Sequence, residues 1–133
     1  MPIKEYDGMY RLNPDVGFDA TKLVGRSIVI TGGASGIGRE MVKAFTAAGA
    51  FVTIGDMQES GQQLAEEIGD RATFVKTDVT NWNDLVKLFE AAIARSPSHL
   101  IDTVIANAGI SGRDSLYWDG KCFTHYSQKL LFC

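Results

Sequence analysis

Three glycines stand close together just after a short apolar run. Gly32, Gly36 and Gly38 lie within the stretch VITGGASGIGREM, and an amphipathic segment follows them directly. Glycine leaves room for a ligand atom beside the backbone, and a helix that begins there offers unpaired N–H groups and a partial positive charge. This combination suits a pyrophosphate group, to which the Ser35 hydroxyl could donate another hydrogen bond. The alternative is a tight strand-to-helix turn that binds nothing.

An acidic residue ends the second apolar run. Asp56 closes the segment FVTIGD, eighteen positions after Gly38. A carboxylate placed there accepts hydrogen bonds from the ribose hydroxyls of an adenine dinucleotide. It would also repel a 2′-phosphate, because two unit charges about 4 Å apart at an effective dielectric constant near 20 cost about 4 kcal/mol before screening. Met57 and Gln58 supply no compensating cation, so the residues favour NAD over NADP. The alternative role of Asp56 is to cap the next helix, and the two roles are compatible.

Two further motifs follow the third and fourth apolar runs. The first is KTDVT, which contains Asp78 and Val79, and the second is NAG, which comprises Asn107, Ala108 and Gly109. Taken alone, the Asp-Val pair is equally compatible with a plain strand-to-helix turn. Four motifs in order, each at the end of an apolar run, are far more specific than any one of them.

These motifs resemble those of the short-chain dehydrogenase/reductase family, and the resemblance covers about residues 19 to 118. It implies hydride transfer between a nicotinamide cofactor and the hydroxyl or carbonyl carbon of a small molecule, by a protein that forms homo-oligomers. It also implies that Asp78 and Val79 contact the adenine, and that the NAG motif supports the sheet and lines a ribose of the cofactor. The residues that we expect to bind NAD are Gly32, Ser35, Gly36, Ile37, Gly38, Asp56, Asp78, Val79, Asn107, Ala108 and Gly109.

The elements that must position these residues alternate along the chain. Short runs rich in β-branched residues have the character of strands covered on both faces. They span residues 27–31, 51–56, 72–76 and 100–107. Amphipathic segments lie between them, at residues 36–50, 57–70 and 80–98. The alternation predicts an α/β fold, the N-terminal half of a Rossmann-like doubly wound parallel sheet, with four strands in the order 3-2-1-4.

The three helices also have predicted faces and ends. The first helix has an apolar face made of Ile37, Met41, Val42, Phe45 and Ala48. The glycines at positions 49 and 69 end the first two helices, and Pro97 limits the third. Thr80 is the expected cap of the third helix.

The residues that carry the family's chemistry are a Ser and a Tyr-Lys pair one helical turn apart, beyond a fifth strand. Tyr117 and Lys121 have the right spacing, but Asp119 and Gly120 between them disfavour a helix. We therefore assign no catalytic residue and expect the Ser-Tyr-Lys portion to be absent from this chain. The alternative to an enzyme is a non-catalytic dinucleotide-binding fragment, or an inactive remnant of a mis-spliced gene.

The last residues differ in character from those before them. The segment 119–133 contains both cysteines and one of the two histidines, and no periodicity continues through it. Codons for Gly120, Lys121 and Cys122 can contain GTAAGT, a typical start of an intron, so this segment is a candidate for translated intron sequence. We therefore divide the chain into an N-terminal extension (1–26), an NAD(P)-binding portion (27–118) and an aberrant tail (119–133).

Composition limits the other classes of function. The chain has 133 residues, 45% of them hydrophobic, and a net charge of −3 at pH 7. These values suit one globular domain and supply no basic surface for nucleic acid. Charges near the start interrupt any secretion signal, and no apolar run is long enough to span a membrane, so we expect a cytoplasmic protein. No pattern of metal ligands is present, and the substrate is left open among steroids, sugars, polyols and polyketide-type carbonyls.

Overall fold

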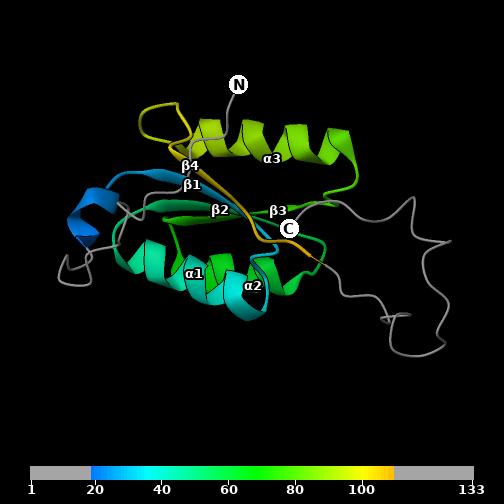
Figure 1. Ribbon diagram of the computed structural model, residues 1–133, viewed down its shortest axis with the longest axis horizontal. Helices are drawn as coiled ribbons and strands as arrows, with labels where there is room; N and C mark the ends of the chain where they lie inside the picture. Colours follow the sequence, from blue (N-terminus) through cyan, green and yellow to red (C-terminus); the bar gives the residue numbers. More distant parts are fainter. Residues whose placement is uncertain (1–18, 110–133) are drawn as a thin grey trace, which may run out of the picture.

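The computed structural model of the protein describes residues 19–109, and one parallel sheet organises them. The elements are η1 (Ala20–Leu23), β1 (Ser27–Thr31), α1 (Gly36–Ala47), β2 (Phe51–Asp56), α2 (Ser60–Ile68), β3 (Ala72–Lys76), α3 (Trp82–Arg95) and β4 (Thr103–Ala106). The strands lie in the order β3-β2-β1-β4, and each neighbouring pair is parallel. Figure 1 shows α1 and α2 on one face of the sheet and α3 on the other. The predicted fold class and strand order are confirmed.

Alternation along the strands divides the core into two layers. Ile28 and Ile30 of β1 belong to the larger cluster of buried residues, which includes Val42 of α1 and Leu64 of α2. Val29, between them, belongs to a smaller cluster under α3. Successive side chains of a strand point to opposite faces, so a strand with helices on both sides buries side chains on both faces and is mostly apolar. All five residues of β1 are buried.

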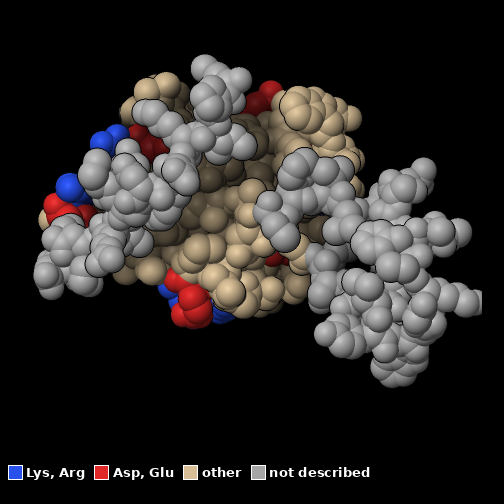
Figure 2. Space-filling model, in the orientation of Figure 1, with Lys and Arg blue, Asp and Glu red and all other residues tan. Residues whose placement is uncertain are grey.

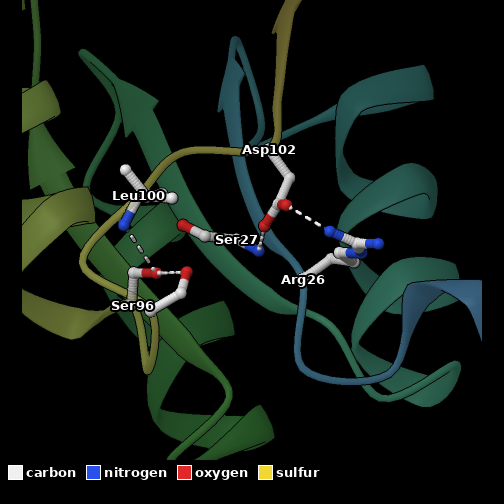
Figure 3. Close-up of polar contacts among 6 residues, drawn as sticks. Arg26, Ser27, Ser96, Leu100 and Asp102 are labelled. Atoms are coloured by element: carbon white, nitrogen blue, oxygen red, sulfur yellow. Dashed lines mark hydrogen bonds and ion pairs between the residues drawn. The ribbon is translucent and has the colours of Figure 1, made fainter.

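Two elements begin later than the sequence predicted. β4 begins at Thr103 instead of residue 100, because the chain turns before the strand: the Leu100 N–H donates to Ser96 Oγ at 3.3 Å, and His99 has a φ of 55°. Figure 3 shows the Ser96–Leu100 contact beside the start of the sheet. α2 begins at Ser60 instead of residue 57, since the Gln58 N–H donates to the Asp56 carboxylate and holds that segment in a turn.

Two helix positions were predicted wrongly. Ile37 does not face the sheet, because the first turn of α1 directs Gly38 toward Gly32 and Asn107 and leaves Ile37 76% exposed. Thr80 does not cap α3. The cap is Asn81, whose side chain accepts a hydrogen bond from the Asn83 N–H at 2.9 Å, while the Thr80 hydroxyl donates to Asp78.

A carboxylate ties the start of β4 to the start of β1. Asp102 Oδ2 accepts a hydrogen bond from the Ser27 N–H at 2.8 Å, and Oδ1 lies 2.7 Å from Arg26 Nη1. The Asp102 N–H in turn donates to the Ser27 carbonyl at 2.9 Å. Figure 3 shows the three residues converging at this edge. The bond from Ser27, followed by that from Arg26, holds the pKa of the Asp102 carboxyl below its ordinary value of 3.8.

Replacing this carboxylate tests its contribution to the fold. We expect Asp102→Ala to lower the free energy of unfolding by about 1–2 kcal/mol at neutral pH, since it removes hydrogen bonds to an ionised and partly exposed group. A lowered folded-state pKa contributes stability that is present well above pH 3.8 and is lost as the pH falls through that lowered pKa. Urea unfolding of both proteins at about pH 7 and about pH 3 measures the difference, which we expect to shrink in acid.

Asp70→Ala is the matched control, because Asp70 is exposed and its side chain makes no described hydrogen bond or ion pair. A stability difference for Asp102→Ala that stays constant from neutral to acidic pH would contradict the assigned role.

The outer side of β4 is an open sheet edge within residues 19–109. β4 pairs only with β1 in this part of the chain, and none of its four residues is fully buried. Val104 is 49% exposed. Figure 2 shows that the described residues around the middle of this view are mostly uncharged, with charged side chains toward the margin. Unpaired edges of this kind favour strand pairing between molecules.

A charged side chain placed on β4 tests whether the open sheet edge drives association of the 133-residue protein. We expect Val104→Lys to lower the oligomeric fraction at least about twofold in sedimentation velocity, because a lysine on an edge strand opposes intermolecular pairing. Val24→Lys is the control, since Val24 is 63% exposed but lies outside the strands. An equal effect of both variants would point to net charge instead of the edge.

Candidate functional site

The glycine turn between β1 and α1 is held by close backbone contacts. Gly32 has a φ of 68°, and a Cβ on it would lie 2.8 Å from Ala108 Cα and 3.0 Å from Asn107 Nδ2. A side chain at Gly32 would therefore be strained and would collide with the end of β4. The Gly32 N–H donates to the Gly55 carbonyl at 2.7 Å, which joins the turn to β2 as well.

Gly36 and Gly38 have different roles in this turn. Gly36 has a φ of 52°, and a Cβ on it would meet nothing within 4 Å, so the turn is open to a ligand at this position. Gly38 faces inward: a Cβ there would overlap the Gly32 carbonyl oxygen and lie 2.6 Å from Asn107 Nδ2. Gly38 thus lets α1 approach the turn, while Gly36 leaves space beside the backbone.

The start of α1 is free to bind an anion. Ser35 occupies the N-cap position, is exposed, and makes no capping hydrogen bond with its side chain. The first turn of α1 contains no acidic residue. The first N–H groups of a helix have no partner within the helix, and they carry its partial positive charge. The Ser35 hydroxyl and these amides could together hold a phosphate group.

Asp56 connects the end of β2 to the glycine turn. Its Oδ2 accepts a hydrogen bond from the Ala34 N–H at 2.9 Å, and its Oδ1 accepts one from the Gln58 N–H at 2.9 Å. It does not cap α2, whose N-cap is Glu59. Each carboxylate oxygen can accept more than one hydrogen bond, so Asp56 retains capacity for the hydroxyls of a ligand.

The NAG motif joins β4 to the end of β1. Asn107 Nδ2 donates to the carbonyls of Thr31 and Gly32, both at 3.1 Å. The Ala108 N–H donates to Thr31 Oγ1 at 3.1 Å. These bonds place the motif beside the glycine turn, whereas Gly109 is exposed and makes no close approach to it.

The third predicted motif, the pair of Asp78 and Val79, lies in the turn after β3. Asp78 Oδ1 accepts hydrogen bonds from the Thr80 backbone and hydroxyl, and the Asp78 N–H donates to Asp84 Oδ2. Val79 is 40% exposed. The turn is linked to β2 by the Thr77 N–H, which donates to the Asp56 carbonyl at 2.9 Å. The structure thus joins the glycine turn, Asp56 and the NAG motif directly, and the backbone bond of Thr77 links the turn that holds Asp78 and Val79 to Asp56.

Three positions in this network were not predicted from the sequence. They are Thr31, which accepts the Ala108 N–H, Ala34, which donates to Asp56, and the buried Thr77. A polar residue that directly follows the apolar run of β1 is a signal that could have identified Thr31. Ala34 takes part through its backbone, so its side chain gives no such signal.

The open Gly36 and the inward-facing Gly38 of α1 can be compared by substitution. We expect Gly38→Ala to lower the free energy of unfolding by about 3 kcal/mol, because the added Cβ must displace the Gly32 backbone and Asn107. Gly36→Ala should cost only about 1 kcal/mol, from the positive φ alone. Urea denaturation compares the two variants, and equal costs would contradict the packing role of Gly38.

Comparison with known proteins identifies the family. A family model described as short chain dehydrogenase matches residues 26–121. The chain belongs to this family. The resemblance predicted from the glycine turn and the NAG motif is thereby confirmed.

Several short chain dehydrogenases and related proteins align with most of this chain. A 5′-hydroxyaverantin dehydrogenase from Dothistroma septosporum is 41% identical over 76% of this chain and 34% of its own length. Momilactone A synthase from Oryza sativa subsp. japonica is 44% identical over 73% of this chain and 35% of its own length. The chain spans about a third of the length of the curated relatives that it matches.

A solved structure supports the same assignment. The crystal structure of 3-ketoacyl-(acyl-carrier-protein) reductase from Brucella melitensis, complexed with NADH, has a TM-score of 0.63 with this chain. The two sequences are 37% identical, and the match covers 66% of this chain and 36% of the reductase. Short chain dehydrogenases bind NAD or NADP, so the family assignment agrees with the expectation of a nicotinamide cofactor.

Residues 19–109 contain neither a metal-binding cluster of side chains nor a helix that could cross a membrane. No group of three or more His, Cys, Asp or Glu side chains there is arranged to hold a metal ion. No helix in the same range has both the length and the apolar character needed to cross a membrane.

Proposed function

We propose that this chain binds NAD(H) at the carboxyl ends of its parallel strands. The observation that carries the proposal is the open, uncapped glycine turn at Ser35 and Gly36 beside the carboxylate of Asp56. In an open α/β sheet, ligands bind outside the carboxyl ends of the strands where the strand order reverses. Here that point lies between β1 and β4.

Each part of the coenzyme has a proposed partner in this site. The pyrophosphate would accept hydrogen bonds from the Ser35 hydroxyl and from the first amides of α1, where Ile37 also lies exposed. The Asp56 carboxylate would accept hydrogen bonds from the hydroxyls of the adenosine ribose. Asp78 and Val79 would contact the adenine, as the family resemblance implies. Asn107, Ala108 and Gly109 would line the ribose next to the nicotinamide, whose ring supplies a hydride acceptor or donor when the coenzyme is bound.

The proposed preference is for NAD over NADP. The Asp56 carboxylate would lie beside the 2′-position of the ribose, where NADP carries a phosphate. The residues directly after it, Met57 and Gln58, carry no positive charge. An interaction difference of only about 1.4 kcal/mol corresponds to a tenfold difference in affinity.

The proposed reaction of the whole enzyme is hydride transfer between a hydroxyl and a carbonyl carbon of a small molecule. The support for this reaction is the family assignment together with relatives that are named dehydrogenases. For the 133-residue chain itself we propose coenzyme binding without turnover, because Asp119 and Gly120 disfavour the helix that a catalytic pair of Tyr117 and Lys121 would need. Tyr117 and Lys121 lie outside the described residues. The cytoplasmic location, the homo-oligomeric state and the three-part division of the chain stay predictions.

Coenzyme titrations test the assignment directly. We expect the protein to bind NADH at least about tenfold more tightly than NADPH, measured by the fluorescence of the reduced nicotinamide. Asp56→Ala should weaken NADH binding and remove most of the roughly tenfold preference for NADH over NADPH. The variant lacks both the acceptor for the ribose hydroxyls and the charge that opposes the 2′-phosphate.

Asp102→Ala is the control for these titrations, since it removes a carboxylate that also accepts a backbone N–H, but at the opposite ends of the strands. We expect this variant to keep the affinities and their ratio. Folded protein that binds neither coenzyme would refute the proposed function. An unchanged affinity ratio in Asp56→Ala would refute the role of Asp56 in selecting NAD.

A further inference from the structure

The Asp56 carboxylate is engaged with the protein backbone before any ligand is considered. One oxygen accepts the Ala34 N–H and the other accepts the Gln58 N–H, both at 2.9 Å. The Asp56 main chain is also fixed, since its carbonyl accepts the Thr77 N–H at 2.9 Å. The side chain is therefore a cross-link between β2 and the glycine turn.

Water cannot easily replace Asp56 as the hydrogen-bond acceptor for the Ala34 N–H. Ala34 is only 2% exposed, so water has little access to this part of the turn. A buried N–H without an acceptor is unfavourable, and hydrogen bonds to a carboxylate are stronger than those to neutral groups. Ala34 directly precedes Ser35 and Gly36, the positions at which the turn is open.

We propose that Asp56 is a positioning residue for the glycine turn, which keeps the pyrophosphate-binding amides in place, in addition to its contact with ribose. This inference deepens the proposed function and rests on it. The Asp56 side chain would then have two opposing effects on phosphate binding. The negative charge of Asp56 opposes a nearby anion, whereas its bond to Ala34 preserves the conformation that binds the anion.

The opposite signs make the inference testable with a probe that has no ribose. If Asp56 acts only through its charge and through ribose, Asp56→Ala should leave the affinity for inorganic pyrophosphate unchanged or increase it. If Asp56 positions the turn, the same variant should bind inorganic pyrophosphate more weakly, although a repulsive charge has been removed.

The experiment is an NMR titration of the 133-residue protein with inorganic pyrophosphate, combined with amide hydrogen exchange in the absence of ligand. For Asp56→Ala we expect an increase of about tenfold in exchange at the Ala34 amide and a severalfold weaker affinity for pyrophosphate. Asp102→Ala again serves as the control and should leave both quantities unchanged. Unchanged or tighter pyrophosphate binding by a folded Asp56→Ala protein, or unchanged exchange at Ala34, would overturn the inference.

Asp56→Asn provides a second variant if Asp56→Ala fails to fold. Its side chain keeps one acceptor oxygen for two amide donors, so we expect effects of the same sign and smaller size. The outcomes separate this inference from the proposed function. Wild-type protein that binds neither NADH nor pyrophosphate refutes the proposed function and, with it, the inference. Wild-type protein that binds both, with no loss of pyrophosphate affinity in the variants, refutes the positioning role alone.

Discussion

Because Gly32 and Gly38 have no side chains, three segments of backbone can pack closely together. The candidate site depends on this close packing. The turn after β1, the first turn of α1 and the end of β4 approach so closely that a single methyl group at either glycine would displace one of them. Asn107 lies beside both glycines and donates to the carbonyls of Thr31 and Gly32. The conformation of the glycine turn is thus set in large part by backbone packing.

Around this contact, hydrogen bonds connect the carboxyl ends of all four strands. Thr31 of β1 accepts the Ala108 N–H after β4, Gly55 of β2 accepts the Gly32 N–H, and the Thr77 N–H after β3 donates to the Asp56 carbonyl. Although the strands are separate in sequence, polar groups at the end of each strand form hydrogen bonds with residues at the ends of neighbouring strands. A site built on such connected strand ends is more rigid than one built on loops alone.

Much of this arrangement could be predicted, because each prediction rested on a strong local pattern. Apolar runs that tolerate burial on both faces indicated the strands, and crossover handedness limited their order. The glycine spacing indicated the turn, because glycine permits close backbone approach at the junction of a strand and a helix, and three further motifs follow it in order. One error fell where neighbouring residues compete for one local role, as Thr80 and Asn81 do for the cap of α3. Side-chain partners distant in sequence, such as Ala34 for Asp56 and Ser27 for Asp102, follow from tertiary contacts that no local pattern contains.

The pairing of β1 with β4 has a consequence for the order in which the sheet assembles. β1, β2 and β3 are joined by short crossovers, whereas the bond between Asp102 and Ser27 closes a loop with a sequence separation of 75 residues. Closing a loop three times longer costs about 1 kcal/mol more chain entropy, and contacts distant in sequence slow folding. We therefore expect the three-stranded unit with α1 and α2 to form first and to serve as the template on which α3 and β4 dock. The NAG motif would then reach the glycine turn in the last step. The candidate site would therefore be complete only after the whole sheet has formed.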